Sequence, residues 1–118
     1  MSGSEPYDPA LALARLDGDE ELLREVVELV HEEWLGKSEE IASALGRADV
    51  AALATAAHFL KGAVSQLFPD GAAAGLAQIE TTARAGDLAA AAAVWQADAP
   101  KVESLLAAAR LWAGTAAS

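Results

Sequence analysis

The chain has 118 residues, no cysteine and a formal net charge of −10, and residues 1–48 alone carry twelve acids and four bases. Its length suits one domain with a single hydrophobic core, and the lack of cysteine excludes disulfides and thiolate metal sites. An acidic chain is repelled by phosphate backbones and anionic lipid, which argues against nucleic-acid and membrane partners.

The N-terminal part of the chain predicts two helices. Helical periodicity covers almost the whole sequence, and no segment alternates as a strand does. After residues 1–7, which we expect to be flexible, Asp8 begins a short helix that Gly18 ends. Asp19 then caps a long helix over 19–46, whose apolar residues recur at helical spacing.

A third helix follows a turn that we expect at Gly46 and Arg47. Asp49 is its predicted cap, and Pro69 ends it because proline cannot continue a helix. The apolar residues of this helix recur at intervals of three and four, which is a heptad-type seam. They are Val50, Leu53, Ala57, Leu60, Val64 and Leu67.

Two further helices are predicted in the C-terminal part. We expect Asp70 to cap a fourth helix that runs to about Ala85, and Asp87 to cap a fifth. Pro100 lies inside the fifth helical stretch and predicts either a kink or a restart there. Residues 114–118 are expected to form a flexible end.

The predicted fold is all-α. The connections are short, and short connections between long amphipathic helices make antiparallel neighbours. We therefore expect an up-down-up-down antiparallel four-helix bundle over residues 8–113, with a short extra N-terminal helix. Trp34, Trp95 and Trp112 are expected to pack in the core or between helices.

His58 lies at the edge of the apolar seam of the third helix, and several small or polar residues share the helical face of this histidine. Residues on its helical face are Ala54, Thr55, Lys61, Gly62 and Ser65. Imidazole is largely neutral and nucleophilic at about pH 7, and Lys61 would bring positive charge toward a phosphoryl group on His58. Gly62 costs about 1 kcal/mol inside a helix relative to alanine, so its presence suggests clearance for a partner. An unreactive surface histidine, as we expect for His31, is the alternative.

The segment AHFLKGAVSQLF, residues 57–68, closely resembles the phosphohistidine motif of histidine-containing phosphotransfer (HPt) domains. Those domains are four-helix bundles that relay phosphoryl groups between receiver domains. The resemblance covers about residues 8–112. It includes the segments LARLDGDEELLREVVELV, GRADVAALATAAHFLKG and IETTARAGDLAAAAAVW.

The resemblance implies a role for each residue that matches the motif. His58 would accept the phosphoryl group on Nε2, Lys61 would stabilise that group, and Gly62 would keep the site accessible. Glu80 matches a position where many members, and the related domain of chemotaxis kinases, have Glu or Gln. There it would accept a hydrogen bond from Nδ1–H, and a plain surface carboxylate is the alternative. Phe68 departs from the pattern, because many members have a second glycine there. We expect it to change the end of the third helix, and whether it also changes one edge of the docking surface stays open from the sequence.

The resemblance also implies a phosphoryl carrier rather than an enzyme. It would take the group from a receiver-domain aspartate and pass it to another receiver, so its partners would be response-regulator receiver domains or a hybrid histidine kinase. We expect no cofactor or metal site of its own, with Mg²⁺ on the partner receiver, and a monomeric, cytoplasmic protein. Docking would use the second and third helices around His58, including Ala54, Thr55, Phe59 and Ser65. Core packing is the favoured role for Phe59.

Two other functions stay open from the sequence. The chain could be the phosphorylatable domain of a chemotaxis-type histidine kinase, which receives its phosphoryl group from ATP on a separate kinase domain. It could also be a helical adaptor that binds partners without phosphorylation.

Overall fold

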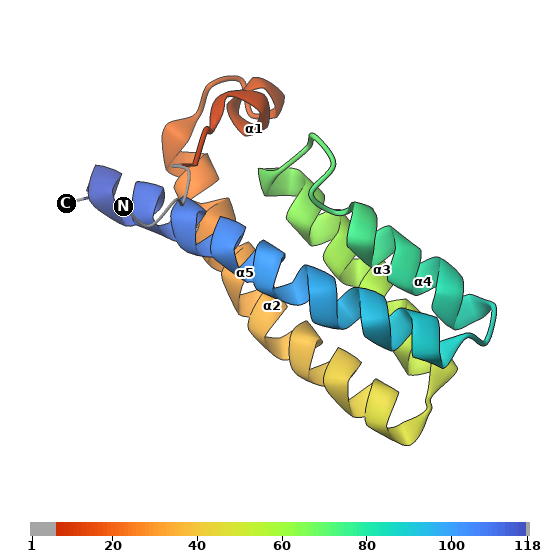
Figure 1. Ribbon diagram of the computed structural model, residues 1–118. Helices are drawn as coiled ribbons and strands as arrows, with labels where there is room; N and C mark the ends of the chain where they lie inside the picture. Colours follow the sequence, from red (N-terminus) through yellow and green to blue (C-terminus); the bar gives the residue numbers. More distant parts are fainter. Residues whose placement is uncertain (1–6, 118) are drawn as a thin grey trace.

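The computed structural model describes residues 7–117, and this part of the chain is all-α. It contains five helices and no strand: α1 (Ala10–Arg15), α2 (Glu20–Arg47), α3 (Val50–Leu67), α4 (Ala74–Arg84) and α5 (Leu88–Ala117). Figure 1 shows the four longer helices lying side by side, with α1 at one end of the molecule. The predicted all-α class is confirmed. Within residues 7–117, no helix combines the length and apolar character needed to cross a membrane.

The four longer helices enclose one core. α3 packs on both α2 and α4, and α5 packs on α4 and α2, while α1 contacts α2. Each long helix contributes fully or almost fully buried apolar side chains, as the spacing of apolar residues in each helix predicts. They include Leu23, Val27, Trp34, Ile41, Leu53, Leu60, Leu67, Leu76, Ile79, Val102 and Leu106.

Three of the predicted N-caps are confirmed. Asp19, Asp49 and Asp87 each accept a hydrogen bond on Oδ1 from the backbone N–H three residues later, at 3.0, 3.1 and 3.0 Å. These bonds satisfy N–H groups that have no partner inside the helix. The starts of α2, α3 and α5 are therefore set by local chemistry.

The turn between α2 and α3 lies later than expected. α2 continues through Gly46 to Arg47, and Ala48 takes the left-handed conformation with a φ of 55°. The N–H of Asp49 then donates to the carbonyl of Ala44 at 2.9 Å. Such a bond closes the exposed carbonyls of the last turn of a helix. The expected turn at Gly46 and Arg47 is wrong, because both residues are helical and the closing hydrogen bonds come from Ala48 and Asp49.

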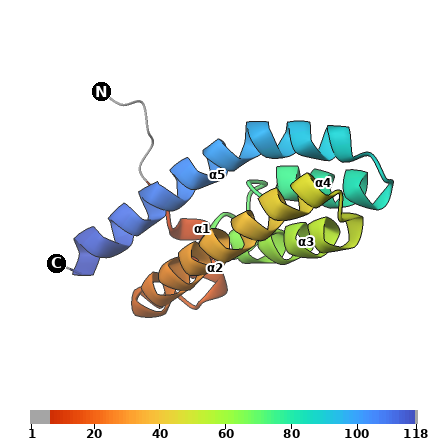
Figure 2. The ribbon, with the colours of Figure 1, turned by 90° about the horizontal axis from the view of Figure 1, so that it is seen from below.

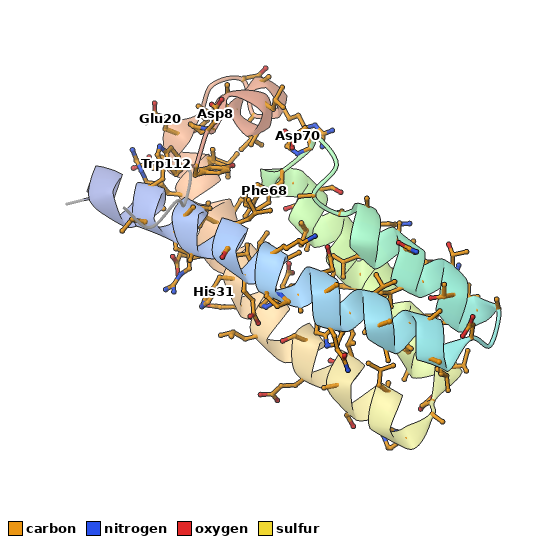
Figure 3. The ribbon with its side chains drawn as sticks, viewed as in Figure 1. Asp8, Glu20, His31, Phe68, Asp70 and Trp112 are labelled. Atoms are coloured by element: carbon orange, nitrogen blue, oxygen red, sulfur yellow. The ribbon has the colours of Figure 1, made fainter. Side chains whose placement is uncertain are left out.

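The predicted cap of α4 is wrong. Asp70 is exposed and lies in the connection before the helix, as Figure 3 shows. α4 begins only at Ala74, and Ala73 occupies the cap position with no side-chain hydrogen bond. Gly71, with a φ of 111°, carries the chain through the turn instead. A glycine tolerates this conformation without steric cost, so the turn extends past Asp70.

α5 is one continuous helix that includes Pro100. Of the two alternatives for this proline, a restart of the helix is therefore wrong. The axis of α5 changes direction near its middle (Figure 2), as expected where proline removes a hydrogen bond and crowds the preceding turn. The helix also continues to Ala117, beyond the boundary expected at residue 113, and Ser118 lies outside the described residues.

α4 and α5 approach one another closely at Gly75. A Cβ at this position would overlap the carboxylate of Asp98 on α5. Burial raises the pKa of Asp98, and the nearby charge of Lys101 lowers it only in part. Glycine at 75 therefore leaves room for the carboxylate of Asp98 against the N-terminal part of α4.

Tyr7 connects the start of the described chain to the ends of α3 and α5. Its hydroxyl donates to the carbonyl of Leu67 at 2.8 Å, and its ring makes edge contacts with Phe68 and Trp112 at centroid distances of 5.3 and 5.6 Å. Figure 3 labels Phe68 and Trp112 at this end of the molecule. Tyr7 is thus a core residue and no part of a flexible end, while residues 1–6 lie outside the described residues.

Phe68 belongs to the same contact and is only 8% exposed. Phe68 is therefore a core residue at the C-terminal end of α3, and its effect on the docking surface stays a prediction. Its aromatic ring packs against Tyr7, and glycine at this position would remove one of the two aromatic contacts of Tyr7.

Tyr7 is the single tyrosine of the chain, so its ionisation can be followed directly by ultraviolet absorbance. Burial and the nearby charge of Asp8 raise its pKa to about 12. We expect a titration midpoint near that value in the folded protein and near 10 in urea. Because the folded-state pKa is the higher one, stability from neutral Tyr7 is complete below about pH 10 and is lost as pH rises toward 12. A midpoint near 10 in the folded protein would contradict the burial of this hydroxyl.

Candidate functional site

The apolar seam of α3 directs His58 outward. Ala57, Leu60 and Val64 are fully buried, whereas 62% of the His58 side chain is exposed. The seam fixes the rotation of the helix about its axis. Because His58 is one residue away from the seam, its side chain lies at the surface. The predicted placement of His58 at the edge of the core is confirmed.

Glu80 on α4 reaches the same place from the neighbouring helix. Its carboxylate Oε2 lies 3.1 Å from His58 Nδ1 and Oε1 lies 3.1 Å from Lys61 Nζ. Among the described residues, Glu80 is the one charged residue that is buried, with 6% of its surface exposed. The structure therefore brings together His58, Lys61 and Glu80, three of the residues selected from the sequence.

Arg84 is a fourth member of this cluster that sequence reasoning missed. Its Nη1 lies 2.7 Å from Glu80 Oε2, one helical turn along α4. The sequence contains a signal for this pair, because a glutamate followed four residues later by an arginine forms ion pairs on a helix surface. That signal could have been found once Glu80 was selected.

The carboxylate of Glu80 is ionised at neutral pH. Burial by itself would raise its pKa, but hydrogen bonds from Lys61 and His58, together with the charge of Arg84, lower the pKa below its usual value. An ionised carboxylate can only accept hydrogen bonds. His58 Nδ1 must therefore carry the proton, which leaves the lone pair of Nε2 free on a largely exposed ring.

Gly62 lies on the exposed face beside His58. A Cβ built at this position would meet no atom of the chain within 4 Å, apart from the helix's own neighbouring backbone. Packing inside the protein therefore does not require glycine here, although glycine costs about 1 kcal/mol relative to alanine in a helix. What the glycine leaves is open space next to the imidazole.

Two of the residues expected to bind a partner are placed differently from the prediction. Ala54 is 4% exposed and belongs to the core, so its assignment to the docking surface is wrong. Phe59 is 42% exposed, so core packing, the favoured role, is wrong for it. Lys37 Nζ of α2 lies 4.8 Å from the centroid of the Phe59 ring. This cation–π contact makes α2 and α3 one continuous surface beside His58.

The other candidate residues differ in how available they are. Thr55 is exposed on α3. Ser65 is half-buried, and its hydroxyl donates to the carbonyl of Lys61 at 2.8 Å, so that hydrogen bond is made inside the helix. His31 lies on α2 (Figure 3) and is also half-buried. It takes no part in the cluster around Glu80.

Within residues 7–117, no group of three or more His, Asp or Glu side chains is arranged to hold a metal ion. The cluster around Glu80 has one carboxylate against three basic groups, which is unsuited to a cation. Comparison with protein-family models, with curated proteins and with solved structures finds no match for this chain. Function must therefore be argued from the geometry of the site.

The contact with Glu80 predicts which ring nitrogen of His58 carries the proton. At a pH of about 8.5, where imidazole is neutral, nitrogen-15 NMR of the wild type should show the Nδ1–H form of His58. Glu80→Leu should shift His58 toward the Nε2–H form. His31, the second histidine, provides an internal reference in the same spectrum. A mainly Nε2–H form of His58 in the wild type would contradict the contact.

Proposed function

We propose that this chain is a histidine phosphotransfer protein that accepts a phosphoryl group on His58 and passes it to a receiver domain. The observation that carries the proposal is the contact between the exposed His58 and the buried, ionised Glu80, with Lys61 on the same carboxylate. In this proposal, the four longer helices form an up-down-up-down antiparallel four-helix bundle of the HPt kind, with α1 as the extra helix.

On the side of this chain, the bond-making step needs only groups that the site contains. The lone pair of His58 Nε2 forms a bond to the phosphorus of a receiver's aspartyl phosphate. The O–P bond breaks, and its electrons stay on the aspartate oxygen. No proton has to move, because Nδ1–H is already held by Glu80 and the ring becomes a cation beside that carboxylate. The reverse steps deliver the group to the next receiver.

The partner would supply the rest of the catalytic machinery. Phosphoryl transfer depends on positioning and on neutralising the charge of the transferred group. We expect the receiver to bring Mg²⁺, while Lys61 contributes one positive charge from this chain. We therefore propose that the protein is a carrier and substrate with no catalytic activity of its own. We also propose that it works in the cytoplasm as a monomer.

The proposed docking surface lies on α2 and α3 around His58. Thr55 and Gly62 are exposed along α3, and Phe59 extends the surface toward α2 through its contact with Lys37. Leu35 of α2 is 54% exposed as well. A modest surface with exposed apolar groups suits transient binding of a receiver domain.

His58→Gln tests the proposed function directly. Wild-type protein should take an acid-labile phosphoryl group from phosphorylated receiver domains, and His58→Gln should take none, because glutamine has no nucleophilic nitrogen. Kinase plus ATP, used as a separate donor, tests the alternative of a chemotaxis-type kinase domain. Equal labelling of wild type and variant would refute the proposal. Full biological function of His58→Gln would favour a helical adaptor.

Gly62→Leu tests whether the missing side chain provides clearance. Because a Cβ meets nothing within the chain, the variant should fold normally. A leucine beside the imidazole should nevertheless slow transfer from a receiver by about 100-fold by displacing the partner. Gly62→Ala should raise helix stability by up to about 1 kcal/mol.

Gly46→Leu is the matched control, since Gly46 is also exposed, helical and free of neighbours within 4 Å, but lies at the far end of α2. It should fold and transfer as the wild type does. Normal transfer by a folded Gly62→Leu protein would show that clearance is not the reason for this glycine.

A further inference from the structure

Glu80 has more cationic partners than its single charge requires. Lys61 Nζ lies 3.1 Å from Glu80 Oε1, and Arg84 Nη1 lies 2.7 Å from Glu80 Oε2. The Nδ1–H of the neutral His58 ring donates to the same carboxylate. The four side chains therefore carry one surplus positive charge. This surplus lies beside an imidazole that is largely exposed.

A phosphoryl group on His58 Nε2 would change this balance. It would bring about two negative charges near neutral pH, and the ring would gain one positive charge because Nδ1 keeps its proton. The four side chains and the phosphoryl group would then be close to neutral together. Without the charge of Arg84, the phosphorylated site would carry an uncompensated negative charge in a partly buried place.

A phosphoryl group on His58 would draw the ammonium of Lys61 at least partly away from Glu80. The Lys61 side chain is 37% exposed, and its head group is a flexible point charge that can swing toward a new partner. The Glu80 side chain is only 7% exposed, and a buried carboxylate that loses a cationic partner is destabilised. A second cation on Glu80 would remove that penalty.

Arg84 is placed to be this second cation. It approaches Oε2, whereas Lys61 bonds to Oε1, so the two do not compete for one oxygen. Both Arg84 and Glu80 belong to α4, one turn apart, so their contact does not depend on the position of α3. Arg84 can therefore stay in place while Lys61 moves.

Resting on the phosphotransfer function proposed above, we infer that Arg84 is a positioning residue: it balances the charge of Glu80 and thereby releases Lys61 to the phosphoryl group on His58. Arg84 acts through Glu80 and Lys61, and the reacting atoms are those of His58 and the donor. A purely structural ion pair on the surface of α4 is the competing explanation.

The lifetime of phosphorylated His58 in the isolated full chain tests this inference. Phosphoramidate serves as the donor: His58 Nε2 bonds to phosphorus, the P–N bond of the donor breaks, and the amine leaves as ammonia after taking up a proton from water. Phosphorus NMR follows the decay of the product, and its loss in His58→Gln assigns the signal to His58. We expect Arg84→Gln to shorten the lifetime by about five- to tenfold and Arg84→Lys to restore it.

A double-mutant comparison separates this role from a structural one. Glu80→Gln removes the charge that Arg84 balances, so adding Arg84→Gln to Glu80→Gln should not change the lifetime further. Arg110→Gln is the matched control, because Arg110 of α5 also forms an exposed ion pair, with Glu28 of α2 at 3.4 Å. It changes the net charge equally and should leave the lifetime as in the wild type.

The possible results distinguish the two proposals. If folded wild type accepts no phosphoryl group from phosphoramidate or from receivers, the proposed function fails and this inference fails with it. If wild type is phosphorylated and Arg84→Gln decays at the wild-type rate, only the inference is overturned. The inference is also overturned if Arg84→Gln shortens the lifetime by the same factor in the Glu80→Gln background as in the chain that keeps Glu80. Since 63% of the Arg84 side chain is exposed, the variants should fold, and thermal melting checks this.

Discussion

The buried carboxylate of Glu80 determines the arrangement of the charged groups around His58. A buried charge is stable only when it is paired and hydrogen-bonded, and Glu80 meets three basic groups on α3 and α4. The contact constrains the rotation of both helices, because His58 and Lys61 must face the carboxylate from one side. It also fixes the proton of His58 on Nδ1, from which the proposed chemistry follows.

The apolar framework makes this contact possible. The seam of α3 fills the core with fully buried side chains and leaves His58 outside. At one end of α3, Tyr7 and Phe68 close the core through an edge contact and the hydrogen bond to Leu67. At the beginning of α4, Gly75 leaves room for the carboxylate of Asp98 of α5. The packing of α3 directly on α4 in this core brings Glu80 to His58.

Local rules predicted some boundaries well and others badly. The caps at Asp19, Asp49 and Asp87 were predictable because a cap depends on a few neighbouring backbone groups. Asp70 follows the same pattern but does not cap α4, because the chain first completes a turn at Gly71. For Pro100, local rules left a kink and a restart open. The helix continues, since packing along a long helix can outweigh one lost hydrogen bond.

The amino-acid sequence alone determined which residues share one face of α3. With 3.6 residues per turn, His58, Lys61 and Gly62 must lie together once the segment is helical. Only the tertiary structure decided that Glu80 reaches His58, that Arg84 joins them, and that Ala54 is buried while Phe59 is exposed. The physical reason is that contacts between helices depend on the rotation and height of each helix, which are set by core packing across the whole molecule.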